Sequence, residues 1–462
     1  MSKINGFAWK NKAIERGNVI RVLKRQLKET TISRDSWKNK YQNLQQDRVG
    51  LISKPARHQY PTSLIWLCIY VYNHSHCSFR SCCTMVASCA ILLKISCKKP
   101  SASSIRNWVI KSGYYAYMQA PPTATKWCII IDESVSIGQE KLLLILGIPL
   151  DNWQFTKAIE QKDATVLHIG IASSWKSAAI ATILTTIANK TPIAYCVSDK
   201  GNNIKAAIKT LGWLHIYDCS HQWARYLEVC YSKDETFVLL MKQMAMLRKK
   251  WILSKYAHLM PPKQRTKARF QNIFPLIEWI EKIELHWDKI DPITQQELQF
   301  LKDNTAMITD LKLLKAVINK MASILKIKGI NHTNLQQCKD LLQKHCTTTS
   351  TAQFSQLLQK DWVQYNAIMK TEDSTYIASS DIIESYFGKF KQKIKLSGMQ
   401  AITETALTMA MWTQNITPAI IETALENIKL KQINQWKNAN TTPSLLKKRT
   451  SFFNQNCKKM AA

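Results

Sequence analysis

Three acidic residues stand where a two-metal phosphoryl-transfer site would need carboxylates. Asp132 closes the apolar run WCIIID, Asp199 follows a second apolar run and precedes a predicted helix, and Glu384 lies inside a basic predicted helix. Carboxylates are the hard oxygen ligands that magnesium prefers. Two divalent ions held close together activate a water or a 3′-hydroxyl and stabilise the leaving oxygen, so no nucleophilic side chain is needed.

Each acid also has a simpler structural interpretation. Asp132 could be a turn residue at the end of a strand, and Asp199 a turn residue before a helix. Glu384 could be a solvated helix residue. Asp381, in the same predicted helix, could be the third acid or the N-cap. The residues alone leave these alternatives open.

The segments around the first two acids predict a small sheet. The run that ends at Asp132 is uninterruptedly apolar and rich in β-branched residues, which indicates a strand buried on both faces. The next two apolar runs are expected to be its antiparallel neighbours. The predicted elements, in chain order, are strands at 127–132, 141–150 and 166–173, a helix at 176–189, a strand at 193–197, a helix capped by Asn202 or Asn203, and a strand from Leu214.

This order of strands and helices is that of a ribonuclease-H-like domain, in which the first and fourth strands lie side by side. Their ends would bring Asp132 and Asp199 together. The third acid lies on a helix whose apolar stripe runs from Ile383 to Ile394. Glu384 lies about 100° around that helix from Ile383.

Four segments resemble those of DDE transposases of bacterial insertion sequences: WCIIIDES, VSDKGNN, YDCSH and SSDIIESYFGKFK. The resemblance covers most of the chain. It implies a transposase that cleaves and transfers DNA strands, with two Mg²⁺ or Mn²⁺ ions held by Asp132, Asp199 and Glu384. It favours Glu384 over Asp381, because the family places Glu before an aromatic-Gly-Lys run.

The resemblance also implies supporting residues. Asp218 and His221 match the acid-x-x-His motif that some DDE families carry after the second acid, where it supports the site. A pair at the start of a helix is the alternative. Lys391 and Lys395 return to the Glu384 side of their helix and, with Lys389, are candidate phosphate contacts. A solvated basic face is the alternative.

The composition favours a polyanionic partner. Lys and Arg number 64 against 32 Asp and Glu, which gives a formal net charge of +32. DNA, RNA or an anionic membrane would each fit this charge, and membrane is the weakest of the three because no apolar run reaches the roughly 20 residues that span a bilayer. DNA is the partner that the resemblance implies. The 13 cysteines and the polar N-terminus predict a reducing compartment, so we expect a cytoplasmic, nucleoid-associated bacterial protein that acts as a homo-oligomer on DNA.

The N-terminal third predicts helices that bind DNA. A long basic helix comes first, and it could coil with a partner or lie along DNA. The segment from Arg57 to Tyr117 resembles a helix-turn-helix, with a recognition helix capped by Ser103 or Ser104 and ending near Gly113. A structural three-helix bundle is the alternative. Outward side chains on that helix are expected to contact DNA, and inward ones to form a small core. The outward set is Arg106, Asn107 and Lys111, and the inward set is Ile105, Trp108 and Val109.

Between His221 and the third acid, helical periodicity dominates. This region predicts an α-helical insertion, in which Arg265, Lys267 and Arg269 are candidate phosphate contacts. The expected class is a mainly helical α/β protein with a mixed five-stranded sheet. The predicted parts are a basic helix (1–50), a DNA-binding domain (51–120), a first catalytic part (121–224), the insertion (225–375), a second catalytic part (376–428) and a basic flexible tail (429–462).

Three functional classes therefore remain after the sequence analysis. The first is an active transposase. The second is a related structure-specific nuclease, and the third is a non-catalytic DNA-binding protein derived from a transposase. The basic N-terminal helices disfavour a minimal nuclease, and the intact acid triad disfavours the non-catalytic class.

Overall fold

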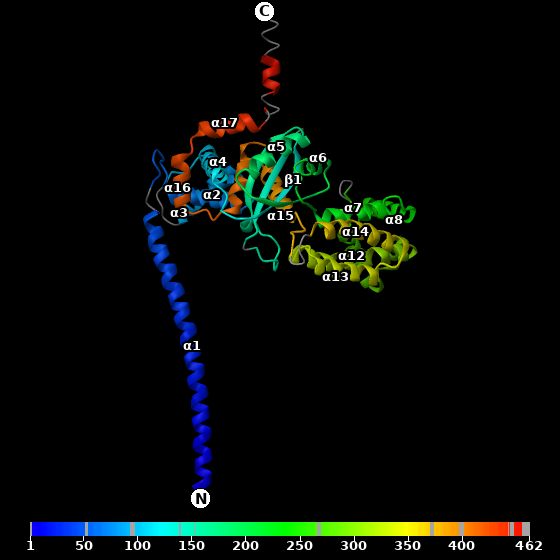
Figure 1. Cartoon of the computed structure of the whole chain (residues 1–462), viewed down its shortest axis with the longest axis horizontal. Coiled ribbons are helices and arrows are strands. Elements are labelled where there is room, and N and C mark those ends of the chain that lie inside the picture. Colours follow the sequence, from blue (N-terminus) through cyan, green and yellow to red (C-terminus); the bar gives the residue numbers. More distant parts are fainter. Residues whose placement is uncertain are drawn as a thin grey trace, which may run out of the picture. The chain divides into compact units, whose positions relative to one another are not determined.

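The computed structural model describes residues 2–50, 54–92, 98–137, 140–151, 153–265, 269–369, 374–396, 402–441, 443 and 448–454 (Figure 1). Helices dominate these residues, and they accompany one mixed five-stranded sheet. The predicted class, a mainly helical α/β protein with one modest sheet, is confirmed. None of the described helices combines the length and the apolarity that a membrane crossing requires.

The chain divides into two compact units. The first comprises Met1–Ser112 and Ile416–Leu430, and the second comprises Gly113–Asn415 and Lys431–Ala462. Residues 416–428 thus belong with the N-terminal helices, although the sequence analysis grouped them with the second catalytic part. The helices of the first unit are α1 (Ser2–Gly50), α2 (Thr62–His74), α3 (Phe79–Leu92), most of α4 (Ala102–Met118) and α16 (Pro418–Asn427).

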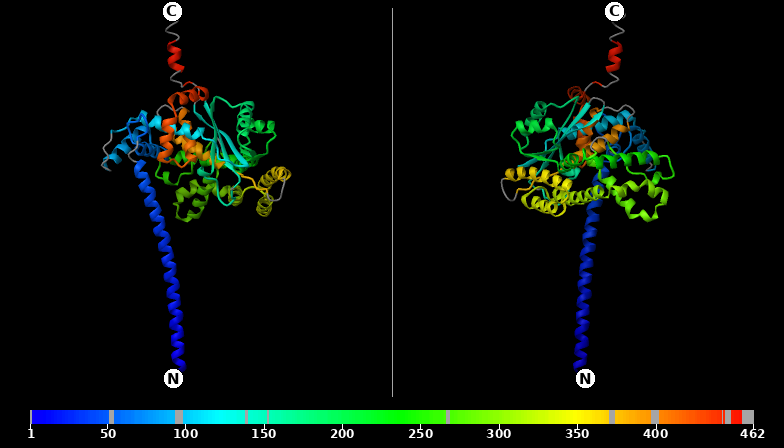
Figure 2. Two further views of the ribbon diagram at one scale, coloured as in Figure 1. Left: turned by 60° about the vertical axis from the view of Figure 1, so that its left-hand side comes forward. Right: turned by 90° about the vertical axis from the view of Figure 1, so that its right-hand side faces the viewer.

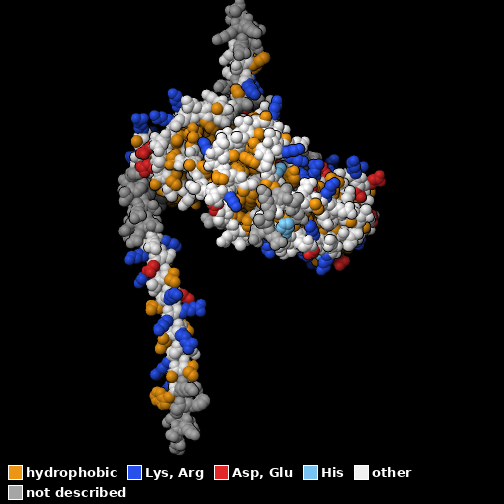
Figure 3. Space-filling model, viewed as in Figure 1, with side chains coloured by type: hydrophobic (Ala, Val, Ile, Leu, Met, Phe, Trp, Pro, Cys, Tyr) orange, Lys and Arg blue, Asp and Glu red, His pale blue; other side chains and the backbone are white. Residues whose placement is uncertain are grey.

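Helix α1 is the long basic helix that the sequence predicts. Between residues 12 and 40, lysine and arginine side chains lie on this helix together with apolar side chains (Figure 3). Leu23 and Leu27 of the predicted stripe are 56% and 69% exposed. The described part of α1 therefore carries exposed apolar side chains.

Helix α4 differs from the prediction at both ends. Ser101, not Ser103 or Ser104, caps it, because the Ser101 Oγ accepts a hydrogen bond from the Ser104 N–H (3.0 Å). Its end lies at Met118 rather than near Gly113. Gly113 is inside the helix, where a Cβ atom would meet the Leu407 backbone at 2.9 Å. The glycine thus permits a close approach of two backbones and does not end the helix.

The second unit contains the sheet, with strand order β3-β2-β1-β4-β5. Strands β1, β2 and β3 pair antiparallel, and β4 pairs parallel with both β1 and β5. The prediction that the first and fourth strands lie side by side is confirmed. The strands are β1 (Trp127–Ile137), β2 (Glu140–Pro149), β3 (Thr165–Ala172), β4 (Ile193–Ser198) and β5 (His215–Tyr217).

Strand β1 runs past its first acid. Asp132 pairs with Leu144 of β2, and the strand continues to Ile137. The interpretation of Asp132 as a turn residue at a strand end is therefore wrong. The polar residues after Asp132 stay extended because β2 supplies hydrogen-bonding partners along their length.

Helices cover both faces of the sheet (Figure 2). Apolar residues of β1, β2 and β4 form one core with α5 (Ser177–Ala188) and α6 (Asn202–Thr210). Helix α15 (Asp381–Lys395) contacts β1, and the 3₁₀ helix η5 (Glu404–Thr413) contacts β3. The predicted stripe on α15 is buried, as its members Phe387 and Phe390 show with 2% and 1% exposure.

The predicted cap of α6 is wrong. Gly201 is its N-cap, and Asn202 and Asn203 are already helical. The Asp199 Oδ1 accepts a hydrogen bond from the Gly201 N–H (2.9 Å). The carboxylate of Asp199 thus forms the turn that leads into α6, so an asparagine cap is not needed there.

The region between β5 and α15 is helical, as predicted. Helix α12 contacts α7, α9, α13 and α14, and the one described β-bridge nearby joins Ile330 to Tyr376. The α-helices are α7 (Cys219–Tyr231), α8 (Glu235–Trp251), α9 (Phe274–Leu285), α10 (Pro292–Glu297), α11 (Gln299–Asp303), α12 (Thr305–Lys328), α13 (His332–His345) and α14 (Thr349–Ile368). Short 3₁₀ helices lie at Gln161–Asp163, Ala257–Leu259, Phe270–Asn272 and Trp287–Lys289.

The tail after residue 429 begins with an ordered helix. Helix α17 (Leu430–Asn440) buries Ile433 and Trp436, and the Trp436 ring packs edge-on against Tyr117. The prediction of a flexible tail is wrong for this stretch, because two apolar residues one turn apart and the ion pair of Lys437 with Glu404 (3.1 Å) hold this polar helix.

Two glycines inside helices offer a matched test of the close approach between α4 and the Leu407 backbone. Gly113→Ala should lower the free energy of unfolding by roughly 1–3 kcal/mol, because the new methyl overpacks against Leu407. Gly388→Ala should raise it by about 0.5–1 kcal/mol, because nothing lies within 4 Å of the added Cβ in α15. Urea unfolding of both variants measures the difference. Equal effects at the two positions would contradict the close approach.

Candidate active site

The first two acids lie at the same end of neighbouring parallel strands. Ile130 of β1 pairs with Val197 of β4, so Asp132 and Asp199 each follow this pair by the same number of residues. Burial and then the charge of Asp199 raise the pKa of Asp132 to about 7, with His221 opposing and Glu384 adding to the rise. The charges of Asp199 and Glu384 therefore both act on the carboxyl group of Asp132.

Glu384 reaches this site from the first turn of α15. Its carboxylate Oε1 lies 3.6 Å from Nε2 of His221, and its side chain is 52% exposed. Helix α15 contacts β1, which carries Asp132. The third acid, predicted from the far end of the chain, therefore contacts His221 and lies on a helix that packs against the strand of Asp132.

Asp218 holds the elements of the site in place. Its buried carboxylate accepts hydrogen bonds from the backbone N–H (2.8 Å) and Nδ1 (2.9 Å) of His221. It also accepts from the backbone N–H (2.6 Å) and the Oγ (3.0 Å) of Ser380, the N-cap of α15. Asp218 is thus both the N-cap of α7 and the link to the helix that carries Glu384.

His221 is a cation within this acidic cluster. Burial by itself would lower the pKa of His221, but the hydrogen bond and charge of Asp218, followed by the charges of Glu384 and Asp199, raise that pKa to about 9. The imidazole is therefore charged at neutral pH. It balances part of the negative charge that the three acids bring together.

The donor set fits hard divalent cations. Three carboxylates provide the oxygen ligands that Mg²⁺ and Mn²⁺ prefer, and their mutual repulsion would be relieved by a bound cation. Within the described residues, no group of three or more His, Cys, Asp or Glu side chains is already arranged to hold a metal ion. Glu384 lies instead against His221.

Asp381 lies close enough for its charge to act on Glu384, but its ion pair is made with another element. It is the first residue of α15, behind the N-cap Ser380, and its Oδ2 pairs with Lys326 Nζ of α12 at 2.5 Å. Asp381 thus joins α15 to the helical region. Of the two candidates for the third acid, Glu384 is the one that contacts His221.

Lys200 is a site residue that the sequence analysis missed. It follows Asp199 directly, and its Nζ contacts Asp361 Oδ2 of α14 at 2.5 Å and the Tyr226 hydroxyl at 3.0 Å. Asp361 also accepts hydrogen bonds from Tyr226 and, at 2.6 Å, from Gln222 Nε2. The only sequence signal was the lysine beside the second acid, because its partner lies far along the chain.

A cavity of about 490 Å³ opens beside the second acid. Asp199, Lys200 and His221 line it together with Arg225 and Arg269. Arg269, predicted as a phosphate contact, is therefore at the site, and Arg225 was missed. Arg265 is exposed and lines a smaller neighbouring cavity. Lys267 lies outside the described residues.

The three lysines predicted on α15 differ in their surroundings. Lys391 and Lys395 are exposed on the helix that carries Glu384. Lys389 lies over the Trp412 ring, with Nζ 4.4 Å from the ring centroid, and burial lowers its pKa. Lys389, predicted as a phosphate contact, thus places its ammonium on an aromatic face.

The predicted recognition helix is more enclosed than expected. Its inward set, Ile105, Trp108 and Val109, is buried as predicted. Arg106 and Asn107 are half-buried. Lys111 does not face outward, because its Nζ donates to the Leu425 carbonyl oxygen of α16 at 3.1 Å and burial lowers its pKa.

The comparisons with known proteins do not supply a family. No protein-family model matches this chain, and a search of curated proteins finds no match. The resemblance to DDE transposases therefore remains a prediction.

Two aspartates that cap helices test the role of Asp218. Asp218→Ala should lower the free energy of unfolding by roughly 3–5 kcal/mol, because it leaves His221 and Ser380 without their buried acceptor. Asp234→Ala removes a more exposed cap, where Asp234 Oδ1 accepts from the Phe237 N–H at 2.8 Å, and should cost only about 1 kcal/mol. Thermal unfolding compares the two variants. Similar losses would mean that Asp218 is no more than an N-cap.

Proposed function

We propose that this protein is a DNA transposase that cleaves and joins DNA strands by metal-dependent phosphoryl transfer. The observation that carries the proposal is the gathering of Asp132, Asp199 and Glu384 around His221. These acids come from two neighbouring parallel strands and a distant helix. Carboxylates that repel one another destabilise the folded protein unless cations neutralise their charge. Metal ions bound by such carboxylates can catalyse phosphoryl transfer.

Each residue of the site has a proposed role. Asp132, Asp199 and Glu384 would hold two Mg²⁺ or Mn²⁺ ions, which when bound activate a water or a 3′-hydroxyl and stabilise the leaving oxygen. His221 keeps Glu384 near the site and offsets its charge. Lys200 and Arg269, which line the adjacent cavity, would bind the DNA backbone.

The charge of the chain supports double-stranded DNA as the substrate. A formal net charge of +32 attracts polyanions over a long range. Transposon ends and target DNA would both be bound, by a homo-oligomer, for which the exposed apolar side chains of α1 are a candidate contact. The proposed setting is the bacterial cytoplasm, at the nucleoid.

Charge-removing substitutions test the metal site. Asp132→Asn, Asp199→Asn and Glu384→Gln should each reduce strand cleavage to background with Mg²⁺, because each removes ligand charge but little volume. DNA affinity should stay within about threefold, since the phosphate contacts lie on other residues. Gel assays of nicking and strand transfer, beside filter binding, measure both properties.

Glu133→Gln is the matched control, because Glu133 follows Asp132 on β1 and pairs with Lys141 at 3.3 Å. It should cleave normally. Cleavage by any of the three triad variants would remove that residue from the site. If the unmodified protein cleaved DNA without strand transfer, a structure-specific nuclease would be favoured. If it bound DNA without cleaving it, a non-catalytic protein would be favoured.

The exposed lysines of α15 allow a second test. Lys391→Gln with Lys395→Gln should lower the slope of log affinity against log salt by roughly 1.8 on duplex DNA, about 0.9 for each lost phosphate contact. Cleavage should fall more than binding, because a phosphate next to the acids would be held less well in line. Fluorescence anisotropy over a salt series measures the slope. An unchanged slope would show that these lysines face only solvent.

A further inference from the structure

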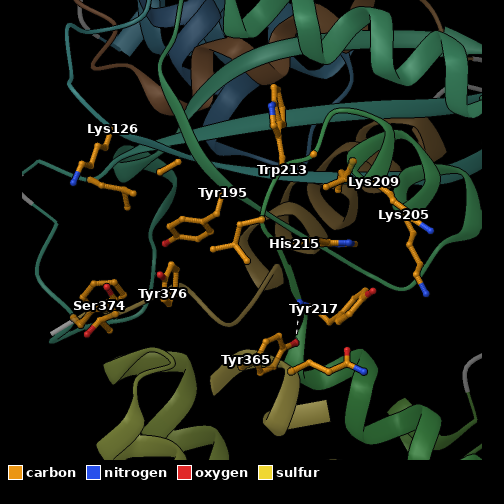
Figure 4. Close-up of a pocket in the computed structure, with 18 residues that line it drawn as sticks. Lys126, Tyr195, Lys205, Lys209, Trp213, His215, Tyr217, Tyr365, Ser374 and Tyr376 are labelled. Atoms are coloured by element: carbon orange, nitrogen blue, oxygen red, sulfur yellow. Dashed lines mark hydrogen bonds between the residues drawn. The ribbon is translucent and has the colours of Figure 1, made fainter. Parts of the chain in front are cut away.

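A second and larger cavity lies beside β5, the edge strand of the sheet. It has a volume of about 1080 Å³ and shares no lining residue with the cavity at Asp199. Residues of β4, α6, β5 and α14 line it, together with the segment before α15 (Figure 4). We name it the β5 groove. None of the roles proposed above uses it.

Aromatic side chains form much of its wall. Tyr195 and Tyr365 are buried, and their hydroxyl oxygens accept hydrogen bonds from the backbone N–H groups of Ile377 (2.9 Å) and Tyr217 (3.1 Å). Tyr376 packs edge-on against Tyr195. These contacts position Tyr195, Tyr365 and Tyr376 in the wall. The aromatic residues that are only half-buried are Phe155, Trp213, Tyr217 and Tyr376.

The charged side chains that line the β5 groove are all positive. Lys126, Lys205 and Lys209 line it, and none of its described lining residues is acidic. All three lysines are exposed. Lys205 and Lys209 lie one turn apart on the same side of α6, and Figure 4 shows them across the groove from Tyr376. An extended polyanion with flat apolar groups would complement both sides at once.

We infer that the β5 groove binds single-stranded DNA. Single strands offer phosphates to lysines and unstacked base faces to aromatic rings, which is the combination that binds them without regard to sequence. A duplex keeps its bases stacked on each other and would leave the aromatic wall unused. An acidic peptide would satisfy the lysines but would not match several half-buried rings.

The groove also lies near the proposed active site. The Lys200 Nζ, whose residue follows Asp199, lies 4.8 Å from the centre of the Tyr217 ring in the groove wall. Ser198 Oγ, at the end of β4, is 2.8 Å from Nε2 of His215 in the groove. A single DNA strand that is separated from its complement beside the scissile phosphate could thus continue along β5. This placement rests on the proposed function, whereas binding of single strands does not.

Matched variants of the full-length protein test the inference. Lys205→Gln with Lys209→Gln removes two groove charges, and Lys320→Gln with Lys344→Gln removes two exposed charges of α12 and α13. Tyr376→Leu removes a ring, and Tyr376→Phe keeps it. Fluorescence anisotropy with labelled oligothymidylate of about 15 nucleotides, in a salt series, measures binding. Circular dichroism confirms that each variant is folded.

The groove variants should lose single-strand binding selectively. The Lys205/Lys209 variant should lower the salt slope by about 1.4, which is about 0.7 for each contact on single strands, while the control pair leaves it unchanged. Tyr376→Leu should weaken binding about 5- to 100-fold, and Tyr376→Phe by less than about twofold. Affinity for a duplex of equal length should change little in all four variants.

Other results would overturn the inference. Equal losses in the groove pair and the control pair would show a general charge effect, and equal losses on duplex would show a duplex surface. Preference of the groove for an RNA oligomer, or for polyglutamate, would reject DNA as its ligand. Asp132→Asn should bind oligothymidylate normally, so a failure of cleavage and a failure of the groove are measured separately.

Discussion

The site depends on the hydrogen bonds that the buried carboxylate of Asp218 accepts. The carboxylate closes the first turn of α7, orients His221 and accepts from both donors of Ser380 at the start of α15. A buried charge with several strong hydrogen bonds can stay ionised, because those bonds replace the lost hydration. This carboxylate thus ties the first turn of α15, which carries Glu384, to the start of α7, and the contact of α15 with β1 adds a second tie to the strand of Asp132.

Electrostatic balance explains how the rest of the site is organised. Asp132 and Asp199 lie close enough to raise the pKa of Asp132, and the charged His221 offsets Glu384. On the other side of Asp199, Asp361 holds Lys200 in position from α14. The helical region thus contributes directly to the site, because it fixes the lysine beside the second acid and carries Arg269 at the cavity.

Local patterns in the sequence predicted the elements well and their ends less well. Apolar runs located the five strands, and the apolar stripe of α15 predicted its buried face. Errors arose where a distant segment decides the outcome. β2 keeps the polar end of β1 extended, the approach of Leu407 explains Gly113 inside α4, and two buried side chains hold α17 on the second unit.

The sequence by itself determined which residue types could hold metal ions, the order of the elements, and the large positive charge. Those properties are local or additive, so they can be read without coordinates. Only the tertiary structure decided that Glu384 meets His221, that Lys200 is held by Asp361, that Lys111 and Lys389 turn inward, and that aromatic rings gather beside β5. These contacts join residues far apart in the chain, and no periodicity or spacing records which distant side chains will pack together.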